Sequence, residues 1–183
     1  MALKLITPPV NEPVSIEEAR AQCRYDDSSN DVILTMLIQA AREQAEHRTG
    51  RVLITQTWEL ALDAFPDGEI ELQKLPAASI SSVKYLDEAA VEQTIAAINY
   101  GMDNYGLQHW LFPAAGYEWP TALSTANAVK VRYIAGYGDT GASVPAGLKR
   151  WMLGAIAYLD ANRGEELPRD FQGGDLDPYR VYP

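Results

Sequence analysis

The order in which hydrophobic periodicity changes along the chain limits the folds that it can adopt. Apolar residues recur at helical spacing over residues 15–50, alternate with polar residues over 55–134, and return to helical spacing over 144–163. The helices at the two ends need mutual burial, and the strands between them can pair with one another. We therefore predict an α+β fold, with a helical bundle formed by the N- and C-terminal helices and an inserted antiparallel β-rich subdomain.

This pattern divides the chain into four expected segments. Residues 1–54 hold the N-terminal helices of the bundle, 55–143 the β-rich insertion, 144–163 the C-terminal bundle helix, and 164–183 an extended C-terminal tail. The 183 residues, 47% of them hydrophobic, are enough to bury a core as one domain or as a domain with an insertion.

The charge and the cysteine content exclude several classes of protein. A net charge of -10 disfavours a surface that grips nucleic acid phosphates as its main task. The single cysteine, Cys23, excludes an internal disulfide and suits a reducing compartment. Residues 1–13 lack the apolar core of a signal peptide, and the apolar run 32–41 is too short to span a bilayer. We expect a protein that is made in the cytoplasm and has no membrane partner.

The first two helices carry recognisable start and stop signals. Ser15 and Glu18 have the spacing of a capping box, and Gly50 is a natural left-handed end for the second helix. Between the helices, residues 25–31 read as a polar turn in which Ser29 or Asn30 caps the second helix.

The second helix shows an apolar stripe and one expected ion pair. Arg42 and Glu46 are placed to pair on its outer face. The stripe that we expect to be buried consists of Ile33, Leu34, Leu37, Ile38, Ala41 and Ala45.

The central region predicts five or six short antiparallel strands. Residues 58–62, 70–72 and 129–133 alternate between apolar and polar side chains. Residues 82–86 and 91–95 flank a polar turn and read as a hairpin.

The third helix follows a glycine-containing loop, and we expect Ser143 to cap it, with Pro145 in its first turn. Its apolar stripe is wide enough to pack on the second helix and still touch another chain. The residues that we assign to this bundle or oligomer contact are Leu148, Trp151, Met152, Ile156 and Leu159.

The aromatic-rich segment 100–119 leaves two interpretations open. Aromatic faces bind sugars and bases, so Trp110, Trp119 and the nearby tyrosines could form a platform for a small ligand or a carbohydrate. Alternatively, these rings supply the buried area that a thin sheet needs.

No motif predicts catalytic chemistry, a cofactor or a metal. The two histidines have no recognisable partners, and no serine lies in a strand-to-helix elbow. The acidic turn 25–31 lacks the glycine and the distal glutamate of a calcium loop. We expect no enzyme activity.

The segments 14–24 and 37–51 resemble the opening of head-tail connector (adaptor) proteins of tailed bacteriophages and prophages. Residues 53–60, 80–85 and 129–145 resemble the connector subgroup that carries a β-rich insertion, and the likeness continues to residues 177–181. Residues 96–123 match nothing firmly.

The resemblance implies a structural protein of the virion neck. Copies of it form a ring, usually a dodecamer, beneath the portal protein, extend the DNA channel, and offer a surface to the next tail or stopper protein. DNA passes through the channel without sequence-specific binding, and assembly takes place in the host cytoplasm.

The tail, residues 164–183, contains prolines and glycines and has no helical period. We expect it to become ordered on docking against a neighbouring subunit or the portal, because tyrosine and arginine often anchor interfaces. The alternative is that it folds back and covers the core of its own domain. The residues concerned are Phe171, Tyr179, Arg180 and Tyr182.

Overall fold

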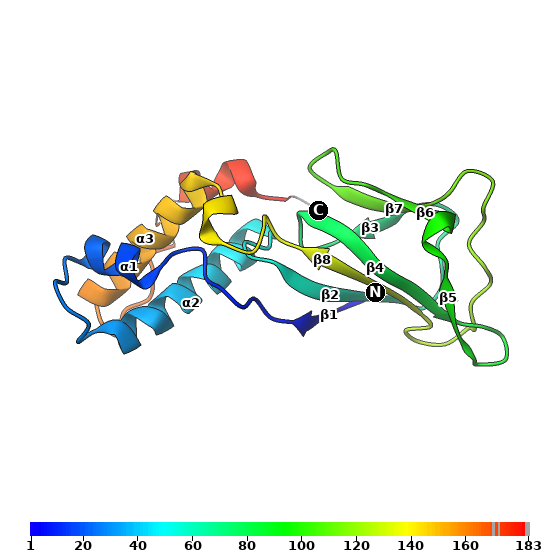
Figure 1. The fold of residues 1–183 in the computed structure, drawn as a ribbon, viewed down its shortest axis with the longest axis horizontal. Helices are drawn as coiled ribbons and strands as arrows, with labels where there is room; N and C mark the ends of the chain where they lie inside the picture. The colour runs from blue at the N-terminus through cyan, green and yellow to red at the C-terminus, as the bar shows by residue number, and fades with distance from the viewer. Residues whose placement is uncertain (170, 172, 182–183) are drawn as a thin grey trace. The chain divides into compact units, whose positions relative to one another are not determined.

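The computed structural model describes residues 1–169, 171 and 173–181 (Figure 1). The chain divides into two compact units. The helical unit comprises residues 9–54 and 137–183, and the β unit comprises residues 1–8 and 55–136. The chain is therefore a mixed α and β protein with antiparallel sheets, as predicted.

The helical unit contains α1 (Ile16–Cys23), α2 (Asp31–Thr49) and α3 (Ala146–Ala161), which lie side by side in Figure 1. The predicted capping box is confirmed: the Glu18 amide donates to the Ser15 hydroxyl, and the Ser15 amide donates to the Glu18 carboxylate. Gly50 ends α2 with a φ of 71°, as the left-handed stop requires.

Two of the predicted caps are wrong. Asn30 occupies the N-cap position of α2 but makes no hydrogen bond to it through its side chain. Ser143 ends a 3₁₀ turn (Gly141–Ser143) and lies too far from the helix, whose N-cap is Pro145. In both places the preceding turn, not a side-chain oxygen, sets where the helix begins.

All three helices contribute to one buried cluster. α2 supplies Leu34, Ile38 and Ala41, each at most 3% exposed. α1 adds Ala19, and Cys23 is partly buried against the cluster. The α3 members of this cluster are Leu148, Trp151, Met152, Ala155 and Ile156.

The β unit contains two antiparallel sheets. One has the strand order β1-β2-β8-β4-β5 and the other β3-β7-β6. The strands are β1 (Ala2–Thr7), β2 (Gln56–Leu62), β3 (Ile70–Leu72), β4 (Ala77–Leu86), β5 (Glu92–Ile95), β6 (Tyr100–Asp103), β7 (His109–Pro113) and β8 (Val129–Ala135).

The predicted alternation and hairpin are confirmed in the larger sheet. On β8 the side chains of Val129, Val131 and Tyr133 are buried, and those between them are not. β4 and β5 pair as the expected hairpin. The two sheets are tied together, because the Ala77 amide donates to His109 Nδ1 at 3.1 Å and the Tyr133 hydroxyl donates to the carbonyl of Gln73.

The strand β1 was not predicted from the sequence. We expected residues 1–54 to hold only helices of the bundle, but β1 pairs with β2 at an edge of the larger sheet, and residues 1–8 group with the β unit. Its pattern was weak, because the apolar alternation breaks at Leu5 and Ile6, where the pairing register also shifts. The segment 96–123, which the resemblance did not cover, contains β6 and β7.

Candidate functional site

The tail, of which the structure describes residues 164–169, 171 and 173–181, is called the C-terminal segment below. It packs against α3 within the helical unit (Figure 1). It is not extended, because it contains a short helix α4 (Gly173–Leu176) and a 3₁₀ turn (Asp177–Tyr179). Leu167 and Leu176 are 8% and 0% exposed. The described residues make the contacts of the alternative prediction, in which the segment folds back and covers the core of its own domain. That the segment becomes ordered on docking stays a prediction.

Phe171 and Tyr179 are the aromatic contacts of this segment with the core. The Phe171 ring packs edge-on against Trp151 at 6.1 Å between centroids. The Tyr179 ring lies over Gly147 of α3, where an added Cβ would come within 2.6 Å of the hydroxyl oxygen. A glycine is therefore needed at position 147 for this packing.

One side-chain and one backbone donor form hydrogen bonds that fix the end of the segment. Arg51 Nε donates to the carbonyl of Tyr179 at 2.6 Å, and the Val181 amide donates to the carbonyl of Thr49 at 2.9 Å. Arg180 pairs with Asp177 at 3.2 Å. Tyr182 lies outside the described residues.

The five α3 residues that we assigned to a bundle or oligomer contact are used inside the helical unit. Leu148, Trp151, Met152 and Ile156 are fully buried, and Leu159 is partly buried against the same cluster. α1, α2 and the C-terminal segment all pack against α3, and Phe171 and Tyr179 of that segment contact the same cluster. That the stripe also touches another chain stays a prediction.

A different face of α3 is accessible. Together with α1 it forms a groove of about 420 Å³, which we call the α1–α3 groove. Arg150 at its edge has a side chain that is 74% exposed and lies 3.3 Å from Asp175. The groove is lined by Gln22, Ala146, Lys149, Arg150, Leu153 and Gly154.

Arg42 anchors a buried ion-pair network in the helical unit. Its side chain is 6% exposed and lies 2.8 Å from Glu12 and 3.1 Å from Glu46. Glu46 in turn accepts the amide of Leu53 at 2.9 Å. The predicted pair of Arg42 and Glu46 is confirmed, but it is buried rather than on the outer face. Burial raises the pKa of Glu12, against the lowering effect of Arg42.

α2 also carries an exposed apolar patch, which we call the α2 patch. Val32, Ile33 and Met36 are 77%, 37% and 65% exposed. The sequence analysis placed Ile33 in the buried stripe and did not single out the other two. A signal was present, because the apolar residues of 32–38 surround more of the helix than one core can cover.

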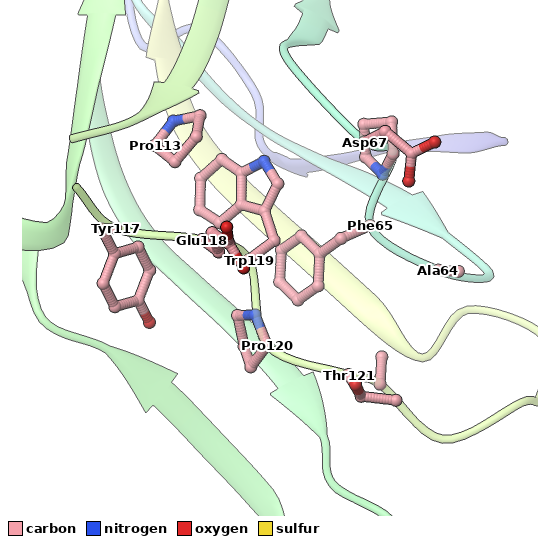
Figure 2. Close-up of a pocket in the computed structure, with 11 residues that line it drawn as sticks. Ala64, Phe65, Asp67, Pro113, Tyr117, Glu118, Trp119, Pro120 and Thr121 are labelled. Carbon is pink, nitrogen blue, oxygen red and sulfur yellow. The ribbon is translucent and has the colours of Figure 1, made fainter. Parts of the chain in front are cut away.

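The β unit contains an aromatic pocket of about 570 Å³, shown in Figure 2. Phe65 and Trp119 stack at 5.0 Å with an interplanar angle of 9°, and Tyr117 meets Trp119 edge-on at 6.4 Å. The indole nitrogen of Trp119 donates to the carbonyl of Gly68 at 2.8 Å. These contacts hold the loop 114–122 against the turn 64–68.

The structure brings together only part of the predicted aromatic platform, because Trp119 and Tyr117 line this pocket. Trp110 lies on β7 and is not among the residues that line this pocket, and Tyr105 is fully exposed. Trp119 instead packs on Phe65, which the sequence analysis had assigned to a turn.

In the part of the chain that the structure describes, no three or more His, Cys, Asp or Glu side chains are grouped so that they could hold a metal ion. Across the same residues, every helix is too short or too polar to cross a membrane.

Three solved chains share this fold over all of this chain and 97% of their own. They come from the neck of an empty GTA particle computed with C6 symmetry (19% identity, TM-score 0.85) and the virion of a native gene transfer agent (GTA) particle (22%, 0.83). The third comes from the neck of a native GTA particle computed with C12 symmetry (22%, 0.78). At these identities the likeness is one of fold.

A comparison with curated protein sequences found no significant match. The profile of the phage gp6-like head-tail connector proteins matches residues 13–105, which run from before α1 to just past β6 and include parts of both units. This match spans half of the chain, and the resemblance seen in the sequence points the same way. The chain belongs to the phage gp6-like head-tail connector protein family.

Proposed function

We propose that this chain is a structural protein of the virion neck, in which copies form a ring beneath the portal protein, extend the DNA channel, and join the head to the tail. The observation that carries this proposal is the family match over residues 13–105. The fold shared with chains from GTA necks and virions supports it.

We also propose how the helices and the β-rich part of the chain are arranged. α1, α2 and α3 form the bundle, and the β-rich part is an insertion between α2 and α3. We place the working boundaries at 1–54, 55–143, 144–163 and 164–183, with residues 1–8 returning to the sheet as β1. The division of the chain into a helical unit and a β unit supports this arrangement.

The partners follow from the same role. We propose twelve copies per ring, with the portal on one side and the next tail or stopper protein on the other. The net charge of -10 supports a channel through which DNA passes without sequence-specific binding, because an acidic wall does not hold phosphates. The site of action is the neck of the virion, after assembly in the host cytoplasm, and no membrane or enzyme activity is involved.

For the portal contact we propose the outer surface of the folded C-terminal segment. Phe171 and Tyr179 are engaged with their own core, so they would act by holding this surface in place. Arg180, whose side chain is 35% exposed, and Asp177, at 53%, are available for polar contacts. Tyr182 remains part of the proposed contact on sequence grounds.

The function can be tested by deleting the coding sequence from the genome that encodes it. We expect DNA-filled heads and free tails that do not join, and restoration of complete particles when the intact chain is supplied in trans. A complementing variant with Arg180 and Asp177 both changed to Ala should join heads and tails less efficiently. Complete particles in the absence of the protein would contradict the proposed function.

A further inference from the structure

The α2 patch is an apolar surface that the described part of the helical unit leaves uncovered. Val32, Ile33 and Met36 follow one another at positions that share a helix face, and Val32 and Met36 are 77% and 65% exposed. Single exposed apolar side chains are ordinary, but three adjoining ones make a contiguous surface that is stabilised by being covered.

The surroundings of the α2 patch are acidic on balance. Glu43, two helical turns beyond Met36, has a side chain that is 62% exposed. It lies 3.6 Å from the buried Arg42, which is shared with Glu12 and Glu46. The loop that precedes α2 exposes Asp26 and Asp27, and Arg24 in the same loop offsets one of these charges. Two copies of the patch placed face to face would bring carboxylates together, which is unfavourable. A surface with an apolar floor and cationic groups at its edge is a better partner.

The α1–α3 groove on the same unit has that composition. Leu153, Ala146 and Gly154 give it an apolar floor, and the absence of a side chain at Gly154 allows a close approach by another helix. Lys149 and Arg150 are its cations. Lys149 lies 2.7 Å from Glu18 and Arg150 lies 3.3 Å from Asp175, but the Arg150 side chain is 74% exposed, so it can also reach a carboxylate on another copy.

We propose that the α2 patch of one copy docks into the α1–α3 groove of the next copy in the ring, with Glu43 close to Arg150. This inference rests on the proposed function, which requires a ring, and it names the two surfaces that close the ring. The surfaces share no residue, so the contact is head-to-tail, and contacts of that kind form rings when the rotation closes.

A cross-linking experiment tests the contact directly. In a Cys23→Ser background, Met36→Cys and Gln22→Cys are combined, and the chain is assembled on the portal from the same genome and treated with a short bismaleimide. Both positions are exposed, and the change at Gln22, which lines the groove, leaves Arg150 and Glu43 in place. We expect a ladder of covalently linked copies, and no linked pair when either Cys substitution is present alone.

A charge exchange provides an independent readout. Arg150→Glu should raise the concentration needed for half-maximal ring formation by about tenfold, which corresponds to about 1.4 kcal/mol. Adding Glu43→Lys should restore it. Glu88→Lys, an exposed change in the β unit, is the matched control and should not restore assembly.

The outcomes separate the contact from the function. Rings on the portal without a ladder, or a linked dimer from Met36→Cys alone, would overturn this contact and leave the proposed function intact. Failure of the intact chain to form any ring on the portal would overturn both.

Discussion

The two ends of the chain contribute differently to the stability of the units to which they belong. The C-terminal segment brings Leu167 and Leu176 into the helical core, at 8% and 0% exposure. The N-terminal strand β1 adds hydrogen bonds at a sheet edge but leaves most of its side chains exposed or partly exposed, with Leu5 at 40%. We therefore expect buried apolar area, more than backbone pairing, to decide how much a chain end contributes to the free energy of unfolding.

Removing each end tests this difference, and the largest effect is expected here. Truncation after Glu166 removes two buried leucines, each worth about 1.5–3 kcal/mol when fully buried. It should strongly reduce hydrogen-exchange protection in α3. Deletion of residues 1–6 should reduce protection in β2 to a smaller extent. Equal losses, or an unaffected α3, would contradict the comparison.

The ion pairs of the two units also differ in burial. The pairs of Arg42 in the helical unit are largely buried, whereas the pair of Lys84 with Glu92 in the β unit is exposed. Arg42→Met removes the buried cation that lies 2.8 Å from Glu12 and 3.1 Å from Glu46, and breaking a buried pair in this way costs about 3–5 kcal/mol. Lys84→Met in the β unit breaks an exposed pair with Glu92 and should change the free energy of unfolding far less. Urea denaturation of both variants measures this, and a similar loss in each would contradict our account of the network.

Two substitutions in the helical unit compare a fully buried side chain with a partly buried one. Ile156→Ala should cost about 2–5 kcal/mol, because the side chain is fully buried and leaves a cavity. Leu37→Ala is the matched comparison, and it should cost less because Leu37 is only partly buried. Thermal and urea denaturation provide the measurement. A larger loss for Leu37 would mean that α2 packs differently from the arrangement described here.

The smallest expected effect is the contribution of Glu18 to the free energy of unfolding, and this contribution depends on pH. The hydrogen bond from Lys149 is the main cause that lowers the pKa of Glu18, and the Ser15 amide adds to it. A lowered pKa in the folded state means that the stabilisation is present at neutral pH and is lost as the pH falls through that pKa. Glu18→Gln keeps the cap and should cost less than about 1 kcal/mol at neutral pH.

The difference in the free energy of unfolding between Glu18→Gln and the unaltered protein should disappear in acid, because both side chains are then uncharged. Glu17→Gln, on the same turn but without Lys149, serves as the control. A gap that widens as the pH falls would show that the ion pair is not its source.

Most local signals were predicted well from the sequence, although the caps at Asn30 and Ser143 were not. Ser15 with Glu18, Gly50, and the alternation of Val129, Val131 and Tyr133 each depend on residues a few positions apart, and the structure has all of them. The family was also evident, because the order of these signals along the chain carries more information than any one of them.

Features that depend on distant parts of the chain were not predicted. The burial of Arg42 depends on Glu12, thirty residues away. The position of Tyr179 depends on Arg51 and Gly147. The exposed Val32 and Met36 look like core residues in a sequence, since nothing local states which side of a helix lacks a partner. The proposed contact surfaces therefore came from the structure.

We propose that copies of this chain form a ring on the portal. Native mass spectrometry of the chain mixed with the portal encoded by the same genome measures the stoichiometry directly. We predict a complex with one copy of this chain for each portal subunit. A portal that remains unbound, or that carries isolated copies in variable number at saturating concentration, would contradict the account.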